Sequence, residues 1–201
     1  MKKWNTLLTM MLVAAFSVVL TGCETDDYDQ AQNLWGVWEG NLHVTMTYGG
    51  TVYKAYKTVI RFDYDEGTYS SGTGYEIDYY RNAFWGRDYA ASRFTWTVHN
   101  GNIYIYYTDD DYNAVIREYT MQGDYFEGYI DGEDNSAYFR LIKTASPYRW
   151  DTFRYGWHYN ASMSRASLGT DTAHTGLSPK RGIASNLGID DNTSKTDRFA
   201  P

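Results

Sequence analysis

The sequence predicts an all-β protein, with an antiparallel up-and-down barrel of about eight strands and a mostly disordered C-terminal tail. Three observations lead to this fold class. Strand-like runs joined by short turns fill residues 34–143. Tyrosine and tryptophan, which favour strands, are abundant at 21 and 7 residues. The whole chain of 201 residues holds only 3 prolines, so little interrupts a sheet.

The first strand-like run, residues 37–47, alternates between apolar and polar side chains. One face carries Trp38, Leu42, Val44 and Met46, and the other carries Glu39, Asn41, His43 and Thr45. This period of two predicts a half-buried strand. Two glycines in residues 48–51 predict a turn. Residues 52–63 are predicted to form a second strand, and their imperfect alternation of apolar and polar residues indicates a bulge. Residues 68–80 are expected to form one or two strands. Residues 81–93 are compatible with either a short helix or a lid loop, and the sequence does not choose between them.

Asn100 and Gly101 predict a two-residue type I′ turn, the strongest hairpin signal in the chain. The turn fixes the pairing of the strands on either side, so that Trp96 lies opposite Ile105. One face then carries Phe94, Trp96, Val98, Ile103, Ile105 and Tyr107, and the other carries Thr95, Thr97, Tyr104 and Tyr106. Both strands agree on which face is apolar. We therefore expect the first set inside the barrel and the second set outside.

Three further strands are expected after an acidic loop at residues 108–113. They span residues 114–121, 125–131 and 136–142. A turn at Gly123 and Asp124 pairs Met121 with Phe126, Tyr119 with Gly128 and Arg117 with Ile130. That register predicts that Arg117 points into the barrel.

The N-terminus has the features of an export signal. Residues 1–22 begin with two lysines and continue with an apolar run that is short for a membrane span. The run ends in Leu20-Thr21-Gly22-Cys23, which resembles the lipobox of bacterial lipoproteins. The resemblance implies a lipid anchor on Cys23. Residues 23–33 are expected to form an acidic tether, and the run from Glu24 to Asp29 within them resembles the surface-export signal of Bacteroidetes lipoproteins. We therefore expect an outer-membrane lipoprotein at the cell surface, with the periplasmic face as the alternative.

Gly36-Val37-Trp38 reproduces the G-x-W motif that opens the first strand of lipocalins and related calycins. Residues 94–105 resemble a hairpin of lipocalin-like Bacteroidetes lipoproteins. The resemblance covers residues 34–143 and implies a lipocalin-like barrel. In that family an arginine of the last strand often lies over the tryptophan, and this implies barrel closure by Trp38 and Arg140 through a cation–π contact.

The chain after residue 143 divides into two parts. Residues 144–159 hold six large aromatic side chains, at positions 148, 150, 153, 155, 157 and 159. Such a density requires burial, so this segment is expected to pack on the barrel or on a partner. Residues 160–201 are rich in small and polar residues, and we expect a low-complexity flexible tail.

Catalytic and metal-binding patterns are absent from the sequence. The four histidines show no ligand spacing, and no nucleophile elbow, phosphate-binding loop or dinucleotide fingerprint is present. Asp109, Asp110 and Asp111 lack the rest of an EF-hand loop, which favours a solvated turn over a calcium site. The net charge of −7 argues against nucleic acid as a partner. We therefore expect no enzyme, no cofactor and no metal.

Two functions fit these features of the sequence. The first is a membrane-anchored, lipocalin-like binding protein for a small ligand of acidic or amphipathic character. Its expected ligand-binding residues are Phe94, Trp96, Tyr107, Arg117 and Tyr119, with Arg117 receiving a ligand carboxylate. The alternative is a cell-surface glycan-binding, adhesion or assembly module. It would use an outward stripe formed by Tyr104, Tyr106, Tyr125, Tyr129 and Tyr138.

Overall fold

The computed structural model describes residues 27–65, 67–68, 70–81, 83, 87–157 and 179–187. Its elements are α2 (Asp27–Leu34), β1 (Gly36–Asn41), β2 (Val44–Tyr48), β3 (Thr51–Tyr64), β4 (Ser71–Tyr80), β5 (Tyr89–His99), β6 (Asn102–Tyr107), β7 (Tyr112–Gln122), β8 (Tyr125–Asp131), β9 (Ser136–Lys143), a 3₁₀ turn η1 (Trp150–Thr152) and β10 (Lys180–Ile183). The signal segment and the predicted lipid-attachment residue Cys23 lie outside the described residues.

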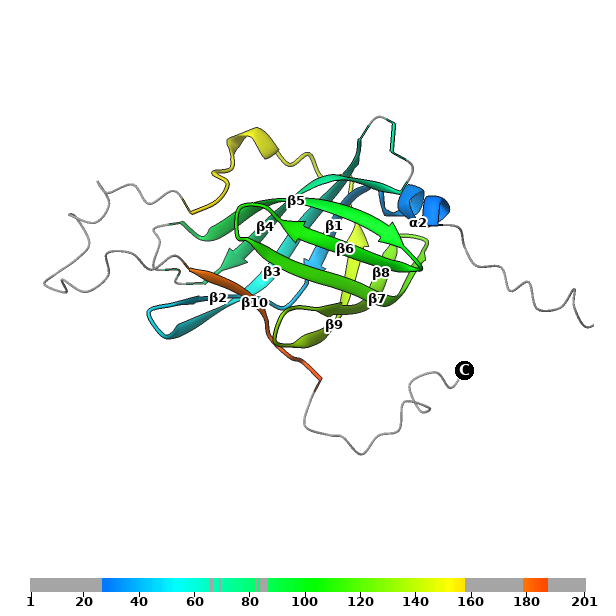
Figure 1. Cartoon of the computed structure of the whole chain (residues 1–201). Helices are drawn as coiled ribbons and strands as arrows, with labels where there is room; N and C mark the ends of the chain where they lie inside the picture. Colours follow the sequence, from blue (N-terminus) through cyan, green and yellow to red (C-terminus); the bar gives the residue numbers. More distant parts are fainter. Residues whose placement is uncertain are drawn as a thin grey trace, which may run out of the picture.

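Eight of these strands form a closed antiparallel barrel, which confirms the predicted fold class. The barrel contains β1 and β3 to β9, and it closes because β1 pairs with β3 on one side and β9 on the other (Figure 1). At this seam Gly40 is required by space, since a Cβ there would lie 2.5 Å from the Arg140 carbonyl oxygen. Closure leaves no free edge along these eight strands.

The β5–β6 hairpin has the register that the sequence predicts. Trp96 pairs with Ile105, and Asn100 and Gly101 have φ angles of 51° and 71°, as a type I′ turn requires. Trp96 is buried and Thr97 exposed, which confirms the assignment of the two faces. The Trp96 indole N–H donates to the Thr73 carbonyl at 2.9 Å, so its polar atom is satisfied inside the barrel.

Strand β4 is continuous through Gly72 and Gly74. The sequence alone did not decide whether this stretch forms one strand or two, and the structure shows one. The two glycines leave space for the aromatic rings of the neighbouring strand. A Cβ on Gly74 would lie 2.1 Å from the Phe94 ring, and one on Gly72 would lie 1.9 Å from the Asp63 carbonyl oxygen and 3.0 Å from the Trp96 ring. Their role is therefore to admit the β3 backbone and large interior side chains rather than to break the strand.

The predicted single strand over residues 37–47 is divided into β1 and β2. The backbone bends at His43, whose φ of 57° lies in the left-handed region. After the bend, β2 leaves the barrel and forms a hairpin with the first residues of β3. The predicted bulge in β3 is present between Ala55 and Lys57. The predicted apolar face, Trp38, Leu42, Val44 and Met46, is fully buried.

Residues 27–34 form helix α2, whereas the sequence predicted that this acidic stretch is a tether. Ala31 and Leu34 are buried in the barrel core, and this burial fixes the helix. The Asp27 carboxylate accepts hydrogen bonds from the backbone N–H groups of Asn100 and Gly101 at 3.0 and 3.1 Å. The helix thus covers the barrel end at which the β5–β6 turn lies (Figure 1).

The aromatic segment after β9 lies on the outer face of the barrel. Phe153 packs against Tyr89 with ring centroids 5.1 Å apart, and Tyr155 packs against Tyr75 at 5.4 Å. The Tyr148 hydroxyl donates to Glu39 at 2.6 Å. The segment therefore covers strands β1, β3, β4 and β5. Among the described residues, no helix is long and apolar enough to cross a membrane.

Candidate functional site

Three carboxylates point into the barrel at the end opposite α2. They are Glu76, Asp78 and Asp110, here called the acidic layer, and their side chains are 0%, 1% and 2% exposed. Glu76 and Asp78 are two residues apart on β4 and so share its inward face, while Asp110 lies in the turn after β6. Buried carboxylates need a positive partner, because desolvation of a lone charge is costly.

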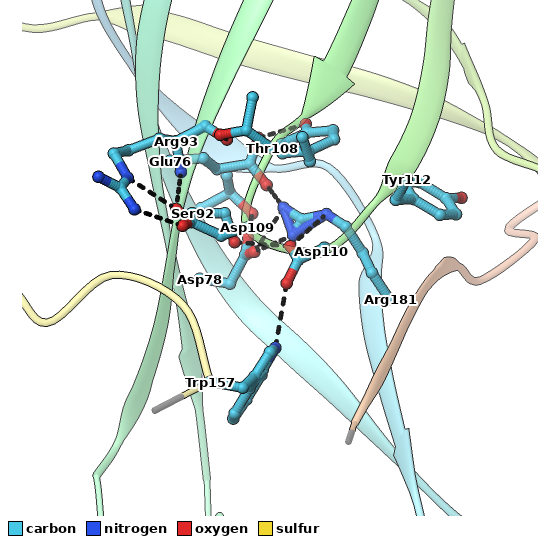
Figure 2. A network of polar contacts seen from close by, with 12 residues as sticks. Glu76, Asp78, Ser92, Arg93, Thr108, Asp109, Asp110, Tyr112, Trp157 and Arg181 are labelled. Carbon is cyan, nitrogen blue, oxygen red and sulfur yellow. Dashed lines mark hydrogen bonds and ion pairs between the residues drawn. The ribbon is translucent and has the colours of Figure 1, made fainter. Parts of the chain in front are cut away.

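The partner of the acidic layer is Arg181 of β10, which enters the barrel from the C-terminal part of the chain (Figure 2). Its guanidinium donates to Asp78 at 3.0 and 3.1 Å and also donates to Glu76. Its Nε lies 3.7 Å from Asp110. The guanidinium carbon lies 3.9 Å from the centre of the Tyr107 ring, so a cation–π contact adds to the ion pairs.

The burial of these groups and the charges around them shift the pKa values of Asp78, Arg181 and Tyr107. Burial raises the pKa of the Asp78 carboxyl well above its ordinary 3.8, and the Glu76 charge raises it further, while Arg181 opposes both. Burial alone would lower the pKa of Arg181, but Glu76 and Asp78 outweigh it and raise that pKa, so the guanidinium stays charged. Burial and Glu76 raise the pKa of Tyr107, whose hydroxyl donates to Glu76 at 2.7 Å.

Additional hydrogen bonds from the surrounding strands hold the acidic layer in place. Ser92 donates to Asp110 at 2.6 Å, and the Trp157 indole N–H donates to the other oxygen of Asp110 at 3.0 Å (Figure 2). Thr58 donates to Asp78 at 2.7 Å. These donors come from three different parts of the chain, and together they fix the positions of the carboxylates.

The other carboxylates of the predicted acidic loop also have protein donors. Asp109 accepts from the Arg93 backbone N–H at 2.8 Å and from its guanidinium at 2.6 and 3.0 Å. Asp111 accepts from the Tyr106 hydroxyl at 3.0 Å. In the part of the chain that the structure describes, no cluster of three or more His, Cys, Asp or Glu side chains is arranged for a metal ion.

Four of the five predicted ligand-binding residues lie inside the barrel. Phe94, Trp96 and Tyr107 are buried, and Tyr119 packs against the core. Phe94 contacts Tyr107 with ring centroids 5.6 Å apart. These rings lie in the interior between α2 and the acidic layer. Of the four, Tyr107 contacts the charged group, Phe94 packs against Tyr107, and Tyr119 contacts Gln30 of α2 at the other end.

The fifth residue, Arg117, is outside the barrel, and the predicted register was wrong there. Arg117 pairs with Tyr129 instead of Ile130, because a bulge lies between Arg117 and Thr120. Glu118 in this bulge has a φ of 48°. Arg117 donates to Asp131 at 2.5 Å on the outer face and stacks on Tyr129. It therefore cannot receive a ligand carboxylate inside.

Arg140 does not lie over Trp38, which corrects a second expectation. Its side chain is exposed on β9 and stacks on the Tyr125 ring at 4.2 Å. Lys143, three residues further along, places its ammonium 5.0 Å from the centre of the Trp38 ring. The basic side chain over Trp38 thus comes from the last barrel strand, as the resemblance implies, but it is Lys143 instead of Arg140. The indole N–H of Trp38 donates to the Leu34 carbonyl at 2.7 Å.

The residues of the acidic layer were not predicted from the sequence. One signal was present, because Glu76 and Asp78 alternate in phase with Gly72 and Gly74, and so share one face of β4. Two acids on that face of a barrel strand indicate a charged interior. Arg181 had no local signal, since it lies in a stretch assigned to a flexible tail.

The predicted outward tyrosines lie on the outer face of β6, β8 and β9, and β7 separates those of β6 from the others. Tyr104, Tyr106, Tyr125 and Tyr138 are 44%, 39%, 44% and 38% exposed, and Tyr129 is half-buried beside Tyr138. The aromatic segment 148–157 lies on other strands, so it does not cover them. We call this set the outer tyrosine surface.

The fold and the site define the class of protein: a closed eight-stranded antiparallel β-barrel with a buried charged site at one end, consistent with a lipocalin-like fold. Comparison with family models, curated proteins and solved structures finds no match to this chain.

Proposed function

We propose that this protein is a membrane-anchored, non-catalytic binding protein whose barrel receives the cationic group of a small amphipathic ligand. One observation carries the proposal: the acidic layer holds a guanidinium group inside the barrel, against the Tyr107 ring. A ligand with a guanidinium or ammonium head could make the same ion pairs. The aromatic rings that begin at Phe94 are suited to an apolar part of such a ligand.

The ligand class differs from the acidic ligand that the sequence suggested. That suggestion depended on an inward Arg117, and Arg117 pairs with Asp131 on the outer face. Among the residues that the structure describes, the charged side chains buried in the barrel are carboxylates, apart from Arg181. Electrostatic complementarity therefore favours a cation.

Binding of short alkylguanidines to the full-length Arg181→Ala variant, whose acidic layer has lost its own guanidinium, tests the proposal. We expect an alkylguanidine to raise the melting temperature and an alkylurea of equal length to have no effect, because only the former is charged. Glu76→Gln should weaken the response at least tenfold, whereas Glu127→Gln, on the outer face, should leave it unchanged. Equal responses to the charged and neutral compounds would refute the proposal.

The membrane anchor is a separate part of the proposal and depends on Cys23. Several acyl chains hold a protein at a membrane almost permanently, since each CH₂ contributes roughly 0.8 kcal/mol. We expect Cys23→Ser to accumulate as a soluble or unprocessed precursor in cell fractionation. A variant that still labels with fatty acid and sediments with outer membranes would contradict the anchor. Protease access on intact cells then decides between the cell surface and the periplasmic face.

The outer tyrosine surface supports a second candidate function, a glycan-binding, adhesion or assembly module. Tyr125 stacks with Arg140, and the Tyr138 hydroxyl donates to Glu127, so stacking faces and hydrogen-bonding groups lie together on β8 and β9. A glycan array probed with the intact protein and with Tyr104→Ser/Tyr125→Ser tests this function. Binding that is lost in the double variant would support it, and identical profiles would exclude these tyrosines.

A further inference from the structure

Strand β10 lies along the free edge of the β2–β3 hairpin, outside the closed barrel (Figure 1). Its four residues pair antiparallel with β2, from Lys180 opposite Thr47 to Ile183 opposite Val44. Alternate residues point in opposite directions. Arg181 and Ile183 are buried, while Lys180 is exposed.

Each position of this segment meets a specific feature of the barrel. Arg181 enters the acidic layer and pairs with its carboxylates. At Gly182 a Cβ would lie 3.0 Å from the Thr45 hydroxyl oxygen, so a larger residue requires the Thr45 side chain to shift. Ile183 lies over Gly132, where a Cβ would be 2.9 Å from the Ile183 side chain. The barrel thus provides an ionic contact for Arg181, an apolar contact for Ile183 and a close contact at Gly182.

The end of the segment is held by main-chain contacts. The Ala184 N–H donates to the His43 carbonyl at 2.8 Å. The Asn186 amide accepts from the Tyr138 backbone N–H at 2.8 Å and donates to the Tyr138 carbonyl at 2.7 Å. Asn186 therefore binds the β9 backbone with a donor and an acceptor, as an additional strand would.

We propose that the β2 edge and the acidic layer form one binding site for an extended, arginine-bearing peptide, and that residues 180–186 occupy it in cis. This inference rests on the proposed function, because it assigns the cation to a peptide arginine. A strand ladder can be formed only by a polypeptide, so the ladder favours a peptide over other cations. Addition of a strand to a sheet edge gives affinity through the main chain and specificity through alternate side chains.

The covalent connection sets what a competing peptide must overcome. Residues 158–178 join the aromatic segment to β10, so the cis segment is present at a high effective concentration. A peptide of equal affinity would seldom displace it from the intact chain. Cutting the connection removes this advantage without removing any residue from the protein.

Peptide exchange on a nicked full-length protein tests the proposal. A specific protease site is inserted between residues 169 and 170, and the folded protein is cut and incubated with a fluorescent peptide of residues 179–187. We expect the peptide to replace the β10 fragment, as followed by fluorescence anisotropy and native mass spectrometry. Because the changes below are made only in the peptide, the fold of the barrel is not affected by them.

The peptide variants give matched controls. Arg181→Gln should weaken binding at least tenfold, and Gly182→Val should weaken it as well. Lys180→Gln removes the same charge one residue earlier on the exposed face and should bind like the parent peptide. Equal losses for Lys180→Gln and Arg181→Gln would overturn the proposal, since nonspecific attraction would then explain both.

Four other outcomes would overturn either the peptide site or the small-ligand function. A β10 fragment that never exchanges would show a permanent structural strand and overturn the proposal. A concentration-dependent dimer of the uncut chain that exchanges β10 would assign the site to a second copy, and would also overturn it. Alkylguanidine binding to the Arg181→Ala variant without any peptide exchange would refute this inference alone. Peptide exchange without alkylguanidine binding would refute only the small-ligand function.

Discussion

Arg181 carries its charge into the barrel on a side chain that is only 1% exposed. Removing such an ion from water costs several kcal/mol, and its ion pairs offset this cost only if their geometry is good. Glu76 and Asp78 supply that geometry from one face of β4, and Tyr107 supplies an aromatic face. A hydrophobic filling could stabilise the barrel as well, so the acidic layer is weak evidence for a contribution to stability and is compatible with our proposal that it binds a cation.

Asp78 makes the stability of the protein depend on pH. Its folded pKa is raised well above the ordinary 3.8, so the folded state holds a proton that the unfolded chain has lost above about pH 4. The Asp78 contribution is therefore fully present below that pH and is lost as pH rises through the folded pKa. Its slope is at most about 1.4 kcal/mol per pH unit.

Urea unfolding of the parent and of Asp78→Asn between pH 4 and pH 8 checks this expectation. The asparagine has the same size and does not titrate. The stability of the parent relative to the variant should fall as pH rises. A relative stability that stays level or increases would contradict the raised pKa.

At the scale of the element, the β5–β6 hairpin determines its own register. The type I′ turn and the period of two act within a few residues, so the pairing needs no information from the rest of the chain. The barrel then places Trp96 between Phe62 and Tyr64, with ring centroids 5.8 and 6.0 Å away.

Trp96→Ala should lower the free energy of unfolding by about 3–5 kcal/mol, because it leaves a cavity in a packed interior. The neighbouring Thr97→Ala is exposed on the opposite face and serves as the control, with an expected change below about 0.5 kcal/mol. Chemical denaturation measures both. A Trp96→Ala variant that unfolds like the parent would show that this hairpin does not build the core.

Helix α2 depends on the same hairpin. Asp27→Ala removes two charge-assisted hydrogen bonds to the β5–β6 turn and should cost about 1–2 kcal/mol. The exposed Asp29 in the same helical turn gives the control, since Asp29→Ala should change stability little. Hydrogen exchange of the Asn100 and Gly101 amides should accelerate only in the first variant. Unchanged exchange there would contradict the role of Asp27 in covering the barrel end.

On the scale of the whole molecule, segments on either side of the barrel cover its two ends. Strand β6 runs from the turn beneath α2 to the turn that carries Asp110, so the helix and Arg181 lie at opposite ends. The composition of residues 160–201 alone predicts that proteolysis removes most of them. The structure changes that expectation for residues 179–187, which are paired with β2 and β9.

Limited proteolysis should therefore leave residues 179–187 bound to the barrel even after the preceding connection is cut. The reason is the burial of Arg181 and Ile183, which a protease cannot reach. Native mass spectrometry of the digest detects the retained fragment. Its release at the same rate as the first cut would contradict the contribution of β10 to the folded protein.

The sequence by itself determined the fold class, the β5–β6 register and the inward face of most strands. These features follow from turn chemistry and from a period of two, which act over a few residues. The position of Arg117 was beyond such reasoning, because the bulge at Glu118 contains no glycine to indicate a positive φ. The bulge reverses which face Arg117 occupies, and only the packed strands show it.

The acidic layer and its arginine were decided by the tertiary structure alone. Glu76, Asp110 and Arg181 come from three distant parts of the chain, and barrel closure together with the β2 edge brings them to one end. Each is polar and, taken alone in the sequence, favours the surface. Their burial is possible only because their charges compensate one another in space, and a local pattern carries no information about that compensation.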